Sequence, residues 1–184
     1  MQESTELASR IRNGDSKAFE ILFKRYYTPL YRFATALSND PLSAEDIVQD
    51  VFMRLWEQRS GWEIRTSLKA YLFVAVRNGV YTLQKRQQVR ERSADEIGAD
   101  VFSRNLEGST CDYEILQAAL QKAITELSPR QREVFLMCRV SDLSYAEISQ
   151  TLNISEHTVA SHMARALRHL RHKLSDIARP WMAG

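Results

Sequence analysis

The residues best suited to contact a ligand lie near the C-terminus, on one face of a helix expected from Ser155 to about Ile177. That face carries, at spacings of four, four, three and four, His157, Ser161, Arg165, Arg168 and His172. Short polar side chains followed by arginines suit a reader of the DNA major groove, because small side chains allow close approach and arginine binds guanine or phosphate. The alternative is a solvated face of an ordinary helical domain.

This helix is expected to be the second of a helix-turn-helix. Ser144 and Glu147 form a capping box for a short helix that ends at Leu152. Asn153 stands where the turn needs a left-handed residue, a conformation that Asn tolerates. An apolar face lies on the other side of the last helix, formed by Val159, Met163, Ala166, Leu167, Leu170 and Leu174.

Two other clusters could suggest metal binding or catalysis. The four histidines spread around the last helix without a cysteine or carboxylate cluster, so no metal site is expected at His157, His162, His169 or His172. Asp46 and Asp50 share an exposed helix face but lack a cleft and a histidine partner, which argues against a general acid–base pair. We therefore predict neither an enzyme nor a bound cofactor.

Composition favours helices. The chain has 184 residues, and only 6 Gly and 4 Pro, fewer turn residues than sheet proteins of this length need. No apolar run approaches the ~20 residues of a membrane span, and the N-terminus lacks a signal-peptide core. Together with two distant cysteines, expected to be reduced, this predicts a cytoplasmic protein.

The expected fold is all-α, with two small helical domains at 1–88 and 114–184 joined by a flexible linker at 89–113. Residues 89–114 carry a net charge of −4 between two blocks of +3, and they lose apolar periodicity. One short helix is expected near 97–102. The other expected helices lie at 15–37, 44–58, 67–88, 113–127, 129 onward, 145–152 and 156–177.

Local signals predict where these helices begin and end. Asp15 is expected to cap the first and Pro29 to interrupt it. Capping boxes are expected from Ser43 to Asp46 and from Ser128 to Gln131, and Pro180 marks the end of the last helix.

The order of motifs resembles one family. Residues 44–57, Ala-Glu-Asp-Ile-Val-Gln-Asp-Val-Phe-Met-Arg-Leu-Trp-Glu, resemble region 2.2 of bacterial RNA polymerase sigma factors of the extracytoplasmic-function (ECF) group. Residues 15–34 resemble region 2.1, 68–78 regions 2.3 to 2.4, 127–136 region 4.1 and 144–171 region 4.2. The chain departs from the family's frequent residues at Tyr71, Asp50 and Thr82.

The resemblance implies a sigma factor that binds core RNA polymerase, directs it to promoter DNA and is controlled by an anti-sigma factor. It implies no small-molecule substrate and a monomer when free. The polymerase-binding positions would be Asp46, Gln49 and Asp50, with Phe52 and Trp56 as apolar anchors unless these two aromatics belong to the core.

The resemblance also assigns promoter contacts. For the minus-ten element these are Trp62, Arg65, Lys69, Arg77, Asn78, Tyr81, Lys85 and Arg86, which supply cations for phosphate and surfaces for unstacked bases. Tyr71 and Phe73, in the same helix, are expected in the core. For the minus-thirty-five element they are Arg130, Ser155, His157, Thr158, Ser161, His162, Arg165 and Arg168.

Two other classes remain open. Residues 127–134 and 147–159 also resemble the DNA-binding domain of LuxR-type regulators, but residues 1–88 lack the alternating strands of a receiver or ligand domain. A protein-only adaptor of two helical bundles is the second alternative. Polymerase capture followed by run-off transcription would separate all three.

The linker assignment makes a prediction about proteolysis. Residues 89–113 lack an apolar face, so a protease at limiting concentration cuts there first and releases two folded fragments, identified by mass spectrometry. First cleavage within 44–88 would contradict the layout.

Overall fold

The computed structural model describes residues 2–61, 67–93 and 112–182, and all of its regular elements there are helices. This confirms the all-α prediction for the described residues. Their order is α1 Gln2–Arg12, α2 Ser16–Ser38, α3 Pro41–Glu57, the 3₁₀ turn η1 Arg59–Gly61, α4 Leu68–Ser93, α5 Asp112–Thr125, α6 Pro129–Arg139, α7 Tyr145–Leu152 and α8 Glu156–Met182. None of the described helices is long and apolar enough to cross a membrane.

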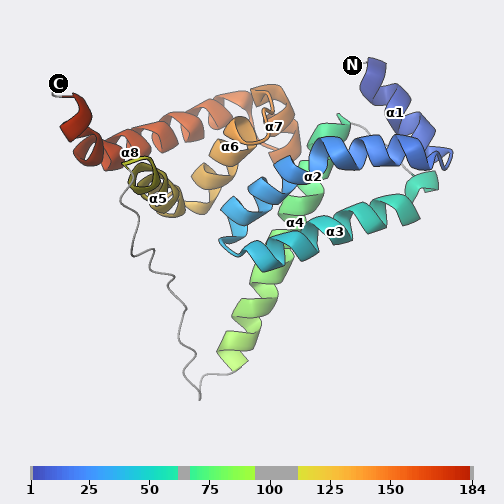
Figure 1. Ribbon diagram of the computed structural model, residues 1–184, viewed down its shortest axis with the longest axis horizontal. Coiled ribbons are helices and arrows are strands. Elements are labelled where there is room, and N and C mark those ends of the chain that lie inside the picture. The colour runs from blue at the N-terminus through green and yellow to red at the C-terminus, as the bar shows by residue number, and fades with distance from the viewer. Residues whose placement is uncertain (1, 62–66, 94–111, 183–184) are drawn as a thin grey trace.

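Two groups of helices form the molecule (Figure 1). In the first, α2 packs against α1, α3 and α4; in the second, α8 packs against α5, α6 and α7. α6 also contacts α2, and α7 contacts α4, so the two groups meet along these helices. Two helical domains are therefore present, as expected, and they contact each other directly.

Helix α1 was not expected from the sequence. Of its side chains that the structure describes, Leu7 and Ile11 are buried in the core. Arg10 then forms an ion pair of 2.8 Å with Asp15, the residue that caps the next helix. Two buried residues four apart give a weak periodic signal, which explains the omission.

Helix starts were predicted with mixed success. Asp15 caps α2 as expected, and its carboxylate accepts hydrogen bonds from the backbone N–H groups of Lys17 and Ala18. The predicted Ser43–Asp46 capping box is wrong: α3 begins three residues earlier, and Asp40 is its N-cap. Asp40 accepts from the Ser43 backbone and from its hydroxyl, while Pro41 occupies the first turn, where a missing N–H costs nothing.

The two prolines expected to break helices do not. α2 continues through Pro29 because Leu30 and Phe33, just beyond it, are fully buried, and their packing offsets the roughly 3 kcal/mol that an internal proline costs. α8 continues through Pro180 to Met182. Pro180 lies so near the helix end that only the last turn is affected.

Two further boundaries differ from the predictions. α4 continues to Ser93 instead of ending at Gln88, so the helix takes five residues from the expected linker. Ser128 is the N-cap of α6 with Pro129 at the first position, but its side chain makes no capping hydrogen bond, so the predicted box with Gln131 is wrong. The short helix expected at 97–102 lies outside the described residues.

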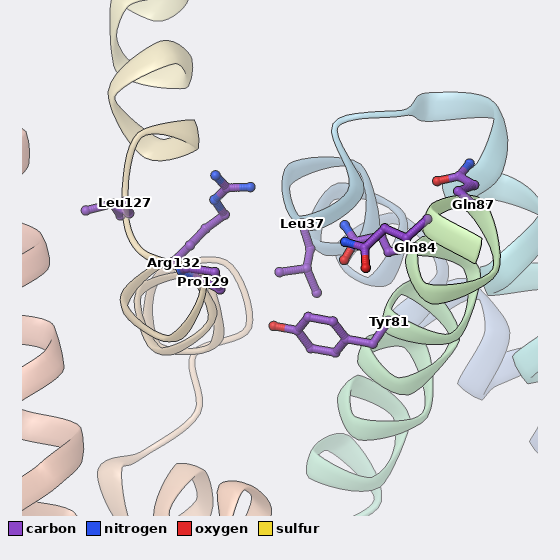
Figure 2. Close-up of a pocket in the computed structure, with 8 residues that line it drawn as sticks. Leu37, Tyr81, Gln84, Gln87, Leu127, Pro129 and Arg132 are labelled. Atoms are coloured by element: carbon purple, nitrogen blue, oxygen red, sulfur yellow. The ribbon is translucent and has the colours of Figure 1, made fainter. Parts of the chain in front are cut away.

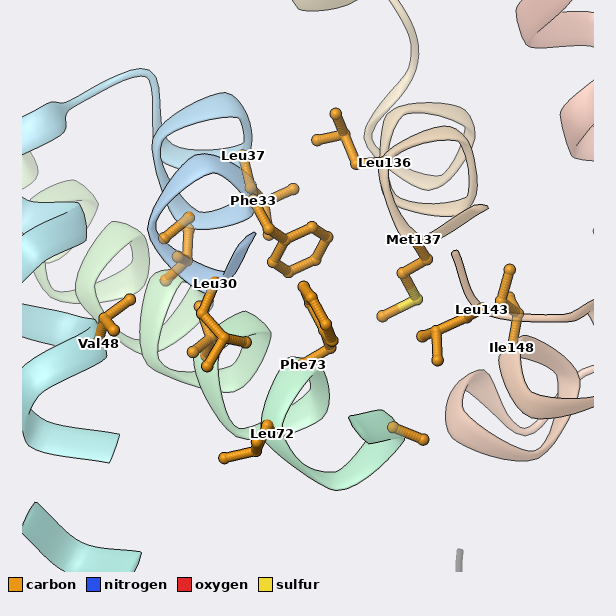
Figure 3. Close-up of a cluster of buried hydrophobic side chains, with 14 of the residues drawn as sticks. Leu30, Phe33, Leu37, Val48, Leu72, Phe73, Leu136, Met137, Leu143 and Ile148 are labelled. Atoms are coloured by element: carbon orange, nitrogen blue, oxygen red, sulfur yellow. The ribbon is translucent and has the colours of Figure 1, made fainter. Parts of the chain in front are cut away.

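One apolar core runs through both groups of helices (Figure 3). Phe33 of α2 and Phe73 of α4 meet edge to face, with ring centroids 5.2 Å apart. Across from them, Met137 of α6 and Leu143 point toward the same cluster. These four side chains are at most 2% exposed, so the contact between the groups is part of the hydrophobic core.

Helices α3 and α4 approach closely at Gly79. A Cβ placed there would lie 2.7 Å from Cγ2 of Ile47, well inside the usual 3.5–4.0 Å separation of carbon atoms. Ile47 is itself buried, so its methyl group has little room to move.

We predict that Gly79→Ala destabilises the protein. Alanine favours a helix by about 0.5–1 kcal/mol over glycine, but overpacking costs about 1–3 kcal/mol, so unfolding in urea should show a net loss of roughly 1–2 kcal/mol. Gly61→Ala is the matched control, because no atom lies within 4 Å of its Cβ position. Adding Ile47→Ala should make the Gly79→Ala change less costly, and an unaltered or raised stability of Gly79→Ala alone would disprove the clash.

Candidate nucleic-acid interface

The turn between α7 and α8 has the predicted geometry. The Ser144 hydroxyl accepts from the Glu147 backbone N–H at 3.2 Å, and the Glu147 carboxylate accepts from the Ser144 N–H at 3.0 Å. This reciprocal capping box fixes the start of α7. Asn153 then takes the left-handed conformation, with φ 51°, and turns the chain into α8. The capping box and the left-handed Asn153 both confirm the sequence prediction.

Ser155 caps the N-terminal end of α8, the helix that carries the candidate DNA contacts. Its hydroxyl oxygen accepts from the Thr158 backbone N–H at 3.1 Å and lies 2.8 Å from the Thr158 hydroxyl. Because both hydroxyls serve the cap, these two residues orient the start of α8 before any ligand arrives. The first turn of α8 therefore has a fixed direction.

The faces of α8 separate as predicted. Val159, Met163, Ala166 and Leu170 are buried. His157, Arg165 and Arg168 are exposed, and Ser161 and His162 are half-buried. The two arginines thus reach solvent from a helix that the core holds in place, the arrangement that a major-groove contact requires.

His162 differs from its exposed neighbours. Burial, followed by the nearby Arg165 and Arg130, lowers the pKa of its imidazole. Its Nδ1 is buried and has no hydrogen-bond partner among the described residues. The lowered pKa favours the neutral imidazole, which suits His162 to a base edge or a packing role better than to a phosphate.

The candidate docking face of α3 is exposed. Asp46, Gln49 and Asp50 all face solvent. Gln49 donates to Glu45 at 3.1 Å, and Asp50 pairs with Arg54 at 3.5 Å in an exposed i,i+4 contact that contributes little to stability. These polar groups therefore remain available to a partner.

The two aromatic anchors proposed for α3 pack against α2. Phe52 is 3% exposed and packs against Phe23 and Phe19, with ring centroids 4.8 and 6.1 Å apart. The prediction of Phe52 as a surface anchor is therefore wrong. Trp56 is half-buried, and its ring centroid lies 5.0 Å from that of Phe19. The Arg59 guanidinium carbon lies 4.4 Å from the centre of the Trp56 ring. Both aromatics hold α3 onto α2.

A groove of about 460 Å³ joins two of the predicted sets. Asp46 and Asp50 of α3 line one side, and Asn78 and Arg86 of α4 line the other. Tyr71 also lines the groove and is half-buried. Phe73 is in the core, as expected. The candidate polymerase and minus-ten surfaces are thus continuous.

The predicted minus-ten residues fall into three groups. Asn78, Lys85 and Arg86 are exposed on α4. Trp62 and Arg65 lie outside the described residues. The remaining three are half-buried and turn toward α6 and α7: Lys69, Arg77 and Tyr81.

Two members of the third group, Lys69 and Arg77, bond to residues of the C-terminal half of the chain. Lys69 Nζ donates to the Asp142 carbonyl oxygen at 3.0 Å. The Arg77 guanidinium lies 5.1 Å from the centre of the Tyr81 ring and forms an ion pair with Glu133 of α6. Burial lowers the pKa of Arg77.

Sequence reasoning missed Glu133. Its carboxylate is 1% exposed, and it binds both Arg77 and Arg130, the latter at 2.7 Å. One signal could have revealed it, because Glu133 shares a helical stripe with Leu136 and Met137, three and four residues further on, which are both buried. A charge in an apolar stripe indicates a buried partner.

A second cavity, of about 370 Å³, opens between the two groups of helices (Figure 2). Tyr81, Gln84 and Leu37 line one side, and Leu127, Pro129 and Arg132 line the other. Arg132 donates to the carbonyl oxygens of Ile124 and Thr125, which fixes it to the end of α5. Burial lowers the pKa of Arg132 as well.

Family comparisons match both halves of the chain. The family model for sigma-70 region 2 matches residues 22–90, and that for sigma-70 region 4 matches residues 117–170. The first match covers the part where a LuxR-type regulator would carry its receiver or ligand domain. The LuxR alternative is therefore not supported.

Individual relatives of the chain are ECF RNA polymerase sigma factors. The ECF RNA polymerase sigma factor SigL of Mycobacterium tuberculosis is 31% identical over 171 residues, covering 89% of this chain and 93% of the relative. SigM of Bacillus subtilis, also an ECF sigma factor, is 25% identical over 150 residues, covering 82% and 91%.

Solved structures share the fold. The sigma factor RpoE of Bartonella quintana, solved with the anti-sigma factor NepR, has a TM-score of 0.70 and 27% identity over 86% of this chain and 98% of that chain. CnrH, solved with the cytosolic domain of CnrY, has a TM-score of 0.72 at 21% identity, covering 94% and 97%.

Proposed function

The chain belongs to the ECF group of RNA polymerase sigma factors, and we propose that α3, α4 and α8 are the surfaces with which it binds core polymerase and promoter DNA. Sigma factors of this family bind core polymerase and direct it to promoters. The family is not enzymatic, and we propose that this chain adds binding surfaces and no reaction of its own.

One observation carries the assignment of α8 to the minus-thirty-five element. Arg165 and Arg168 are exposed on the helix that follows a fixed helix-turn-helix, opposite the buried Val159 and Met163. Arg165 lies two turns beyond His157 on the same face, within reach of a base edge. Arg168 lies about one turn further, where a helix leaving the groove meets phosphate. Ser155, Thr158, Ser161, His162 and Arg130 complete the proposed contact set.

The assignment of α3 to core polymerase rests on its exposed acidic and amide face. Asp46, Gln49 and Asp50 suit a basic partner surface. On α4, the exposed Asn78, Lys85 and Arg86 continue this surface toward the minus-ten element, with Trp62 and Arg65 assigned by family resemblance.

We also propose an anti-sigma partner, a cytoplasmic location and domain limits at 1–88 and 114–184. The anti-sigma proposal is supported by RpoE of Bartonella quintana, which was solved in complex with the anti-sigma factor NepR. The described helices include no membrane span, which is compatible with the location.

For α3, we predict that Asp46→Ala with Gln49→Ala weakens binding to core polymerase while thermal stability stays nearly unchanged, since exposed sites rarely shift stability by more than ~0.5 kcal/mol. Affinity is measured by titrating labelled protein with core enzyme. Glu20→Ala is a matched control, because Glu20 is an exposed carboxylate on α2, away from the candidate face, where it pairs with Lys24 of the same helix. Wild-type affinity in a folded double variant would rule out this face.

For α8, we predict that replacing Arg165 and replacing Arg168 affect DNA binding in different ways. Arg165→Ala should cost about 1–3 kcal/mol on the cognate minus-thirty-five element and relax base preference at one or two positions. Arg168→Ala should weaken binding about equally on all sequences and reduce the salt slope by about one.

Both variants are measured as holoenzyme, on an element selected from a random library and on a scrambled copy, at two salt concentrations. Equal, sequence-independent losses would make Arg165 a phosphate contact. Full activity of both variants would remove this face from the DNA interface.

A further inference from the structure

We propose that Glu133 holds the free chain in a closed state by binding one candidate contact from each promoter element, Arg77 and Arg130. In this state the two groups of helices cannot reach both elements, and core polymerase must separate them. The proposal rests on the proposed function, because it concerns the accessibility of those same surfaces.

Glu133 is placed where a carboxylate needs both cations. Its side chain is 1% exposed, and its two oxygens have different partners: Arg77 on Oε1, and Arg130 on Oε2 at 2.7 Å. Arg130 comes from the same helix as Glu133, whereas Arg77 comes from α4, 56 residues earlier in the chain. Removing Arg77 would leave the buried charge with one partner, which is unfavourable.

Two further hydrogen bonds join the start of α4 to α7 and to the loop that precedes it. The Ser67 hydroxyl donates to Glu147 Oε1 at 2.7 Å, and Lys69 Nζ donates to the Asp142 carbonyl at 3.0 Å. Glu147 also closes the capping box of α7, so this contact connects to the element that positions α8. The closed state therefore engages two candidate minus-ten cations, Lys69 and Arg77, with groups of the C-terminal domain.

Apolar packing surrounds these polar contacts. Phe73 of α4 and Phe33 of α2 belong to the same buried cluster as Met137, Leu143 and Ile148 (Figure 3). Arg77 is only 20% exposed beneath this contact. A phosphate can take the place of Glu133 at the Arg77 guanidinium only if α6 moves away.

Distance along DNA makes the closed state incompatible with simultaneous reading. The two element names place their centres about 25 base pairs apart, which is about 85 Å along straight B-form DNA at 3.4 Å per base pair. In this structure one carboxylate contacts both Arg77 and Arg130. Residues that share one carboxylate cannot contact sites so far apart, so the domains must separate during promoter binding.

The test measures the separation between the domains in the full chain. Spin labels are attached to cysteines replacing Lys24 on α2 and Arg171 on α8, both exposed, in a chain with Cys111→Ser and Cys138→Ser. We expect one short, narrow distance distribution in the free chain and a longer one after addition of core polymerase. An equally short distribution in the polymerase complex would overturn the proposal.

Two variants break the shared ion pair from opposite sides. Glu133→Gln and Arg77→Gln should each shift much of the free-chain distribution to long distances, whereas the control Glu126→Gln, which loses an exposed pair with Lys173 within the C-terminal helices, should not. Circular dichroism checks that each variant is folded. If every folded variant of this pair keeps the short distance, Glu133 does not hold the chain closed.

A binding arm uses a fluorescent single-stranded 30-mer of mixed sequence as the probe. Glu133→Gln should raise the affinity of the free chain for this strand several-fold, because Lys69 and Arg77 become accessible to phosphate, and it should leave holoenzyme affinity within twofold. An equal change in both would show that Glu133 acts on DNA contact itself and would overturn the proposal. Failure of the proposed function has a different signature: the wild-type chain would not bind core polymerase at all, while its closed distance still responded to Glu133→Gln.

Discussion

Helix α4 must satisfy packing on two sides at once, and the rest of the structure depends on this constraint. On one side Gly79 allows Ile47 of α3 to approach within a distance that no larger residue permits. On the other side Phe73 packs against Phe33 and takes part in the cluster that contains Met137 of α6. A helix buried on both sides cannot present all of its polar residues to solvent, so its cations are divided between exposed positions and positions facing the second domain.

The prediction of helices succeeded where the signal is local. Asp15 and Ser144 cap the expected helices because a capping side chain and its backbone partner lie within three residues of each other. Prediction failed at α3, where Asp40 and Ser43 are both good caps and the earlier one gains a further helical turn. It also failed at Pro29, because burial of the residues after it cannot be read from a proline signal.

For the candidate site, too, prediction succeeded where the signal is local and failed where it is not. The exposed face of α8 was predictable from a periodic pattern within one helix, and the structure places Arg165 and Arg168 in solvent accordingly. Phe52 was misassigned because periodicity identifies an apolar stripe but not what covers it; here the rings of Phe19 and Phe23 do. The pairing of Arg77 with Glu133 joins residues 56 positions apart, and no local rule in a single sequence specifies such a contact.

A buried carboxylate at position 133 has a consequence that an apolar residue would lack. Replacing a buried ion pair with well-packed apolar side chains is often neutral or stabilising, so stability alone does not explain Glu133. An apolar contact would resist separation whatever partner arrives, whereas an arginine released from a carboxylate can be satisfied by the oxygens of a phosphate. Arg77 would thus exchange one anion for another when the domains part, and part of the cost of breaking the closed contact would be recovered on promoter DNA. Glu133 keeps Arg130 as a partner from its own helix, so its charge stays compensated after Arg77 leaves. This asymmetry, one partner fixed and one exchangeable, is what makes the contact suitable for a reversible closure.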